Sequence, residues 1–127
     1  MPEEEKTFII AMTIFDNPIH PNDLSEIFNI SNARQSLKGE RQKEPPLPTI
    51  NLWGVSTSGG DDFVMEWQKL KGLFKENWKR IPQVLIQGGY VQITVLPIDE
   101  DRFYPIYLSQ EMIDDLRFIN ATFQVGV

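Results

Sequence analysis

An amphipathic stretch from Asp61 to Arg80 constrains this chain more than any other part of it. Large apolar side chains recur there at steps of three and four residues, which is the spacing of one face of an α-helix. These side chains are Phe63, Trp67, Leu70, Phe74, Trp78 and Ile81. The charged side chains fall mostly on the opposite side, at Glu66, Lys69, Lys71, Glu76 and Lys79. A helix with one apolar face needs a second layer to cover, so the stretch predicts one long helix packed against a sheet.

Three details of this helix can be read from its residues. Ser58 or Asp61 is suited to cap the first turn. Gly72 is the weak position, because glycine inside a helix costs roughly 1 kcal/mol relative to alanine. Trp67 and Trp78 share the apolar face, which favours a buried core, with a tryptophan-lined ligand slot as the alternative.

Runs of β-branched and aromatic residues predict five strands around this helix. Their ranges are 7–15, 50–57, 90–96, 102–107 and 121–127. The first run is nearly continuous in apolar character, which predicts a central position in the sheet. Trp53 and Val55 share one face of the second run, and this face is predicted to meet the core. Pro105 interrupts the fourth run and indicates an edge strand, where two copies of the chain could pair as a homodimer.

Further helices are predicted between these strands. One spans residues 21–29 and begins with Pro21, a residue suited to the first helical position. Another spans residues 108–120, with Ser109 as its N-cap. Its predicted buried stripe is Met112, Ile113, Leu116 and Ile119. Residues 81–87 favour a short helix, with a strand followed by a glycine turn at residues 88–89 as the alternative.

The resulting order, β-α-β-α-α-β-β-α-β, predicts an α+β fold. The expected architecture is a mixed, mostly antiparallel sheet of about five strands with helices layered on one face. In element order it is ferredoxin-like in part. The length of 127 residues fits a single domain spanning residues 1–127.

Composition excludes several classes of protein. Hydrophobic residues make up 41% of the chain, which suits a domain with its own core, and there is no cysteine for a disulfide or a thiolate site. The start, residues 1–6, is acidic and is expected to be a flexible terminus rather than a secretory signal. No apolar run is long enough for a membrane span. The protein is therefore expected to be cytoplasmic, with no membrane association.

The segment 31–49 is predicted to be a long charged and proline-rich loop, the type of loop that is often functional. Residues 31–80 carry nine basic and six acidic side chains, a net charge of +3 in a chain whose net charge is −6. The candidate contacts for an acidic partner are Arg34, Lys38, Arg41 and Lys43. Nucleic acid is the less favoured partner, because the overall charge opposes it.

No catalytic set can be assembled from the sequence. His20 is the only histidine, and it precedes Pro21 at a helix entry, where a capping role is expected. A metal site or a general base would need partners that the composition does not offer, so no metal and no cofactor is predicted. Trp53 and Trp78 are the candidate lining residues of a ligand pocket beside the sheet.

Several packing motifs together resemble a family of small uncharacterised bacterial domains, a domain of unknown function. They are the helix at residues 20–30, Gly39 in a charged loop, the strand Trp53-Gly54-Val55-Ser56-Thr57, and Leu108-Ser109-Gln110-Glu111 leading to Leu116 and an alternating last strand. The resemblance covers most of the chain. It implies a bacterial cytoplasmic domain, and it carries over no catalytic residue.

The sequence thus favours a non-catalytic protein-interaction module, in one version an immunity-like protein that blocks a partner. The alternative is a small-ligand-binding protein or an enzyme with a tryptophan-lined pocket. The two differ in where the tryptophans should lie, because only the second needs them beside an open cavity.

Overall fold

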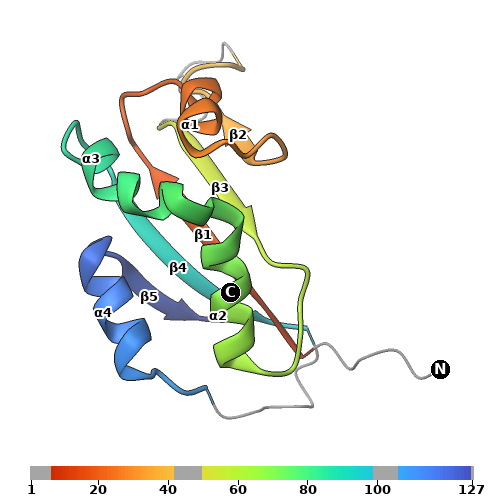
Figure 1. The fold of residues 1–127 in the computed structure, drawn as a ribbon. Coiled ribbons are helices and arrows are strands. Elements are labelled where there is room, and N and C mark those ends of the chain that lie inside the picture. Colours follow the sequence, from red (N-terminus) through yellow and green to blue (C-terminus); the bar gives the residue numbers. More distant parts are fainter. Residues whose placement is uncertain (1–6, 42–49, 99–105, 127) are drawn as a thin grey trace.

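The computed structural model of the protein describes residues 7–41, 50–98 and 106–126. Within these residues, five strands form one mixed sheet in the order β2-β3-β1-β4-β5 (Figure 1). The strands are β1 Phe8–Phe15, β2 Arg34–Ser36, β3 Leu52–Ser56, β4 Tyr90–Pro97 and β5 Thr122–Val125. β1 pairs antiparallel with β3 and β4, β2 pairs antiparallel with β3, and β5 runs parallel to β4. The mixed, mostly antiparallel sheet and the central position of β1 are confirmed.

The helices are layered on one face of this sheet, as predicted (Figure 1). They are α1 Pro21–Phe28, α2 Phe63–Phe74, the 3-10 helix η1 Lys75–Arg80, α3 Ile81–Leu85 and α4 Gln110–Phe118. The helical alternative for residues 81–87 is therefore correct. No described helix combines the length and the apolar character that a membrane crossing would require.

The core lies between the sheet and the helices. Alternate residues of β1 and β4 point into it and are buried, and so are Trp53 and Val55 of β3. The core residues of β1 and β4 are Phe8, Ile10, Met12, Ile14, Val91, Ile93 and Val95. The predicted apolar face of residues 61–81 covers them, because every member of that face is also buried.

The prediction of one continuous helix from Asp61 to Arg80 is wrong. α2 ends at Phe74, and Lys75 has φ 53° and ψ −132°, so the chain turns before η1 begins. The turn keeps Trp78 in the core: its ring packs edge-to-face on Phe74, with centroids 5.6 Å apart, and on Trp67, at 6.1 Å. The first turn is capped by Asp62, whose carboxylate accepts from the backbone N–H of Met65, rather than by Ser58 or Asp61.

One prediction about a loop needs correction, and one about a strand falls mostly outside the described residues. The segment 31–49 contains a short strand, β2, whose pairing with β3 satisfies backbone groups that a loop would leave to water. Residues 42–49 of this segment lie outside the described residues, as do residues 1–6. The predicted strand 102–107 falls mostly on residues 99–105, also outside them, and Ile106 and Tyr107 are in no strand. β4 pairs with β1 on one side and with β5 on the other, so neither of its edges is left for a strand from residues 102–107.

Glu66 was predicted on the polar side of α2, yet its side chain is 1% exposed. Its Oε1 lies 2.6 Å from Lys69 Nζ, and its Oε2 has no hydrogen-bond partner among the described residues. The carboxylate fits because Gly60 has no side chain: a Cβ at that position would collide with Glu66 Oε1. A glycine next to the sheet therefore accounts for a charge that periodicity alone would place in water.

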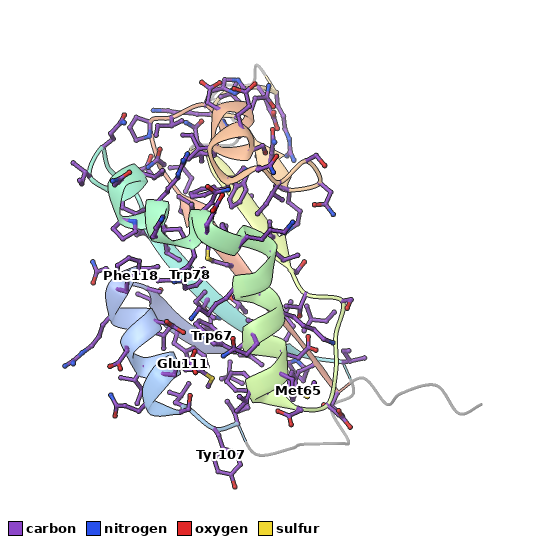
Figure 2. The ribbon with its side chains drawn as sticks, viewed as in Figure 1. Met65, Trp67, Trp78, Tyr107, Glu111 and Phe118 are labelled. Atoms are coloured by element: carbon purple, nitrogen blue, oxygen red, sulfur yellow. The ribbon has the colours of Figure 1, made fainter. Side chains whose placement is uncertain are left out.

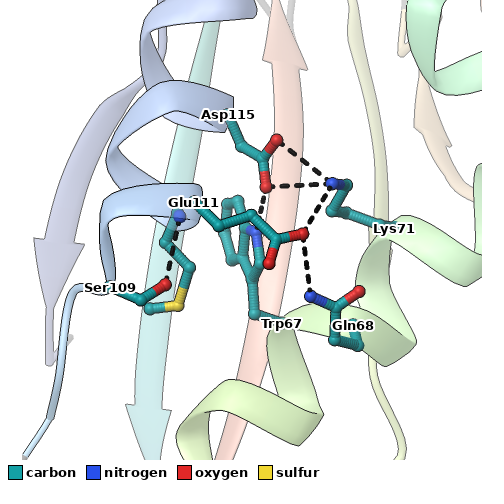
Figure 3. Close-up of polar contacts among 7 residues, drawn as sticks. Trp67, Gln68, Lys71, Ser109, Glu111 and Asp115 are labelled. Carbon is teal, nitrogen blue, oxygen red and sulfur yellow. Dashed lines mark hydrogen bonds and ion pairs between the residues drawn. The ribbon is translucent and has the colours of Figure 1, made fainter.

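A polar cluster fastens α4 to α2 (Figure 3). Trp67 Nε1 donates to Asp115 Oδ2 at 2.8 Å, and Lys71 Nζ lies 3.1 Å from the same carboxylate. Glu111 adds a weaker ion pair with Lys71 at 3.6 Å. These contacts set the rotation of α4 about its axis, so Ile113, predicted to be buried, is 37% exposed on the opposite flank. Met112 and Ile119 are buried as predicted, and Ser109 caps the helix.

The open space beside Gly72 leads to a first prediction. A Cβ at this position of α2 would meet no atom within 4 Å, so Gly72→Ala should raise the free energy of unfolding by roughly 0.5–1 kcal/mol. Urea denaturation measures the change. Gly89→Ala is the matched control and should destabilise, because Gly89 has φ +87° and its Cβ would approach Phe15 O to 2.5 Å. No gain at Gly72 would contradict the account.

The burial of Trp67 leads to a second prediction. The ring is 1% exposed and joins the core to Asp115 of α4, so Trp67→Ala should lower the free energy of unfolding by about 3–5 kcal/mol. Met65→Ala on the same helix serves as the control, since Met65 is 61% exposed and points away from the core (Figure 2). A Trp67→Ala variant as stable as the Met65→Ala variant would contradict the assignment of Trp67 to the core.

Candidate binding groove

An open groove lies between α1 and the segment formed by η1 and α3. Its cavity volume is about 620 Å³, which is within the usual range of ligand-binding sites. Its lining residues are Ile19, Ile27, Lys79, Arg80, Gln83, Val84 and Gln87. We call this cavity the α1–α3 groove.

The first wall is α1 with the loop that leads into it. His20 caps α1, because its Nδ1 accepts from the backbone N–H of Asn22 at 3.1 Å, which confirms the predicted role. Before it, Asn17 is buried and bonds across the groove: its Nδ2 donates to Val84 O at 2.9 Å and to Gly88 O at 2.7 Å. Its Oδ1 accepts from the N–H of Ile19. Asn17 thus holds Ile19 beside α3.

The second wall is η1 followed by α3. A 3-10 helix of six residues is longer than most, and such stretches often mark functional positions. The turn at Lys75 starts η1 in a new direction, and Lys79 and Arg80 at its end line the groove with their side chains exposed. Asn77 of η1 donates to Phe28 O at 3.2 Å and ties this wall to the end of α1. The groove is therefore held by one asparagine from each wall.

The lining divides into an apolar and a polar part. Ile19, Ile27 and Val84 are apolar, and Gln83 and Gln87 each offer an amide that can donate and accept hydrogen bonds. Lys79 and Arg80 contribute two positive charges, and no lining residue is acidic. In a chain of net charge −6, this is a local reversal of sign. Chemically, the arrangement can bind a group that carries both negative charge and apolar surface.

The predicted basic contacts lie elsewhere. Arg34, Lys38 and Arg41 are exposed at or just after the β2 edge, and Lys43 lies outside the described residues. On one side of α1, Ser25 accepts a hydrogen bond from Gln35 of β2, and on the other side Phe28 O accepts one from η1. α1 therefore separates the three basic residues near β2 from the α1–α3 groove.

Arg34 itself lies across Gly54 on the open face of the sheet. Its Nη2 donates to Thr13 Oγ1 at 3.4 Å, and a side chain at Gly54 would block that path. It lines a second, smaller cavity of about 130 Å³, together with Asn32, Gly54, Val55, Ser56 and Leu73. The Arg34 guanidinium is therefore already engaged in a hydrogen bond within the sheet.

The two candidate tryptophans line neither cavity. Trp53 is fully buried, and its Nε1 donates to Ser25 Oγ at 2.9 Å. Trp78 is 8% exposed and packs near Trp67 (Figure 2), with the Lys71 ammonium 5.8 Å from its ring centre. Both rings therefore act as core residues in the described structure. Within the same residues, no group of three or more histidine, aspartate or glutamate side chains could hold a metal ion.

Sequence reasoning missed most of the groove. From the sequence, Lys79 is predicted on the polar side of the helix and Arg80 at its end, and neither Gln83 nor Gln87 is singled out. The signal that could have found them is the sequence Lys79-Arg80-Ile81-Pro82, in which a proline two residues after a basic pair indicates the end of one helix and the start of another.

Comparison of the chain with protein-family models, with curated proteins and with solved structures found no match. The geometry of the groove is therefore the basis for a functional proposal.

The buried bonds of Asn17 lead to a third prediction. Asn17→Ala removes three hydrogen bonds and leaves the carbonyls of Val84 and Gly88 without this donor, so the free energy of unfolding should fall by roughly 2–4 kcal/mol. Amide hydrogen exchange of α3 should speed up at the same time, because α3 loses its tie to the loop. Asn22→Ala on the exposed side of α1 is the control. Equal stability of the two variants would contradict the role of Asn17.

Proposed function

We propose that this chain is a non-catalytic protein-interaction domain that binds an acidic segment of a partner protein in the α1–α3 groove. The observation that carries the proposal is the pair Lys79 and Arg80 in a lining without acidic residues, on a chain whose net charge is −6. Opposite charges at short range favour an acidic ligand there, while the rest of the surface repels it.

The remaining lining residues narrow the partner further. Ile19, Ile27 and Val84 would bury apolar side chains of the segment, which contributes about 25 cal/mol per Å² of apolar surface removed from water. Gln83 and Gln87 would pair with its backbone amides. The fitting partner is therefore a segment in which acidic and aliphatic residues alternate or adjoin, rather than a uniformly acidic tail.

Two features make the groove suitable for recognition. Its walls are tied by Asn17 and Asn77, so little conformational entropy is lost when a ligand binds. Lys79 and Arg80 are exposed and have no acidic neighbour in the groove lining, so their charges are available to a ligand. The immunity-like version, in which the protein blocks its partner, is the form of this proposal that a small acidic chain without a catalytic set suggests. The family resemblance suggests only that the domain is bacterial and cytoplasmic.

The fourth prediction tests the groove directly. A short peptide of alternating glutamate and leucine should bind the protein in isothermal titration calorimetry, and the same peptide with glutamine for glutamate should not. The double variant Lys79→Ala, Arg80→Ala should weaken binding about tenfold, because each exposed ion pair contributes roughly 0.2–1 kcal/mol. Higher salt concentration should also weaken the binding of the acidic peptide to the wild-type protein.

The matched control is the double variant Arg41→Ala, Arg117→Ala, which removes two exposed charges outside the groove lining. It should bind the acidic peptide within about twofold of the wild-type affinity, since both charges are distant from the site. Equal losses in the two double variants would overturn the proposal. So would failure of the acidic peptide to bind, or binding of a small dicarboxylate in its place, which would favour the small-ligand alternative.

A further inference from the structure

β5 is an unprotected edge of the sheet. Among the described strands it has a neighbour on one side only, β4. Residues 118–127 contain no charged residue and no proline, although 24% of the chain is charged. Sheet edges are usually protected from pairing by charge, proline or very short strands. The opposite edge follows this rule, because β2 has three residues and one of them is the exposed Arg34.

The pairing of β5 with β4 determines which backbone groups are open. The N–H of Gly126 donates to Val95 O at 2.8 Å, so Gly126 and, by alternation, Gln124 direct their backbone groups toward β4. The N–H and C=O groups of Phe123 and Val125 therefore point away from β4 and out of the sheet edge. Two donors and two acceptors stand in a row there.

We propose that two copies of this chain pair through β5 as antiparallel strands, about a two-fold axis that passes beside Gln124. In this arrangement Phe123 of each copy stands opposite Val125 of the partner subunit, and the two residues exchange both of their hydrogen bonds. The four outward groups of each strand are then satisfied by four bonds across the axis. The two sheets become one continuous sheet through the pair.

The register follows from the geometry of the edge. With a two-fold axis perpendicular to the sheet, the helix-covered faces of both copies lie on the same side. Phe123 and Val125 both point to that face, so each of them can stand opposite only a Phe123 or a Val125 of the second copy. An axis beside Phe123 would require the N–H of Ala121 to donate a hydrogen bond to the second copy. That N–H already donates to Leu116 O at 2.9 Å. An axis beside Val125 would call on residue 127, outside the described residues. The axis beside Gln124 uses only backbone groups that have no hydrogen-bond partner among the described residues.

The flank of α4 favours a second copy over an isolated peptide. Ile113 is 37% exposed and Leu116 is half-buried, on the side of α4 that faces away from α2. α4 lies next to β5 on the helix-covered face (Figure 1), so the same two-fold axis brings the α4 helices of both copies together on that face. A second copy covers Ile113 and the 45%-exposed Val125 as well as the strand edge. A lone peptide strand would cover the edge and leave Ile113 in water.

The fifth prediction tests the backbone contact by analytical ultracentrifugation. The wild-type protein should be a dimer that dissociates on dilution. Val125→Pro should be monomeric with an unchanged melting temperature, because its lost N–H points away from β4 and proline is tolerated at an edge. Val125→Ala is the control, and it should keep the dimer with an affinity lowered by about fivefold or less. A monomeric wild-type protein, or a dimeric Val125→Pro variant, would overturn the proposal.

A charge pair tests the register independently of proline. Gln124→Lys and Gln124→Glu should each weaken the dimer, because identical charges meet at the two-fold axis, and an equimolar mixture of the two should restore dimers that contain one copy of each. Asn22→Lys and Asn22→Asp, on the exposed side of α1 and away from β5 and α4, should leave the dimer unchanged. Failure of the mixture to recover dimers would overturn the pairing beside Gln124, and so would dimers unaffected by either charge.

Discussion

An aromatic cluster at one end of the core holds this fold together. Trp53 of β3, Phe28 of α1, Phe74 of α2 and Trp78 of η1 come from four elements, and neighbouring rings lie with centroids 5.1–6.0 Å apart. Aromatic rings at such distances add roughly 0.5–1.5 kcal/mol per pair to the burial of their area. Because η1 and α1 both depend on this cluster, it also positions the two walls of the α1–α3 groove.

The two proposed surfaces use different parts of the chain. The groove is lined by the loop before α1, by α1, η1 and α3, whereas the paired edge belongs to β5 and the flank of α4. No lining residue of the groove lies in α4 or β5, so pairing through β5 would leave both grooves of a dimer accessible. Two grooves on one dimer would bind a partner that presents two acidic segments with greater avidity than a single groove.

Local patterns were reliable where burial and capping act within one element. The central position of β1, the capping residues His20 and Ser109, and Trp53 in the core all follow from patterns within a single segment. The same reasoning failed for Glu66 and Ile113, because their burial depends on residues outside their own helices. Gly60 leaves room for the Glu66 carboxylate, and Trp67 and Lys71 of α2 bond to Asp115 and so set the rotation of α4. The groove could not be predicted for the same reason, because the residues that hold its walls together, such as Asn17 and Gly88, are far apart in sequence.

By itself, the sequence determined that this chain is an α+β protein with β1 at the centre and one apolar helical face over it. This is possible because hydrophobic periodicity indicates which face of each helix or strand is buried. Only the tertiary structure decided that the helix from Asp61 turns at Lys75. Periodicity could not show the turn, because Trp78 and Ile81 are buried after it as they would be in a straight helix, and the turn brings Lys79 and Arg80 to the groove.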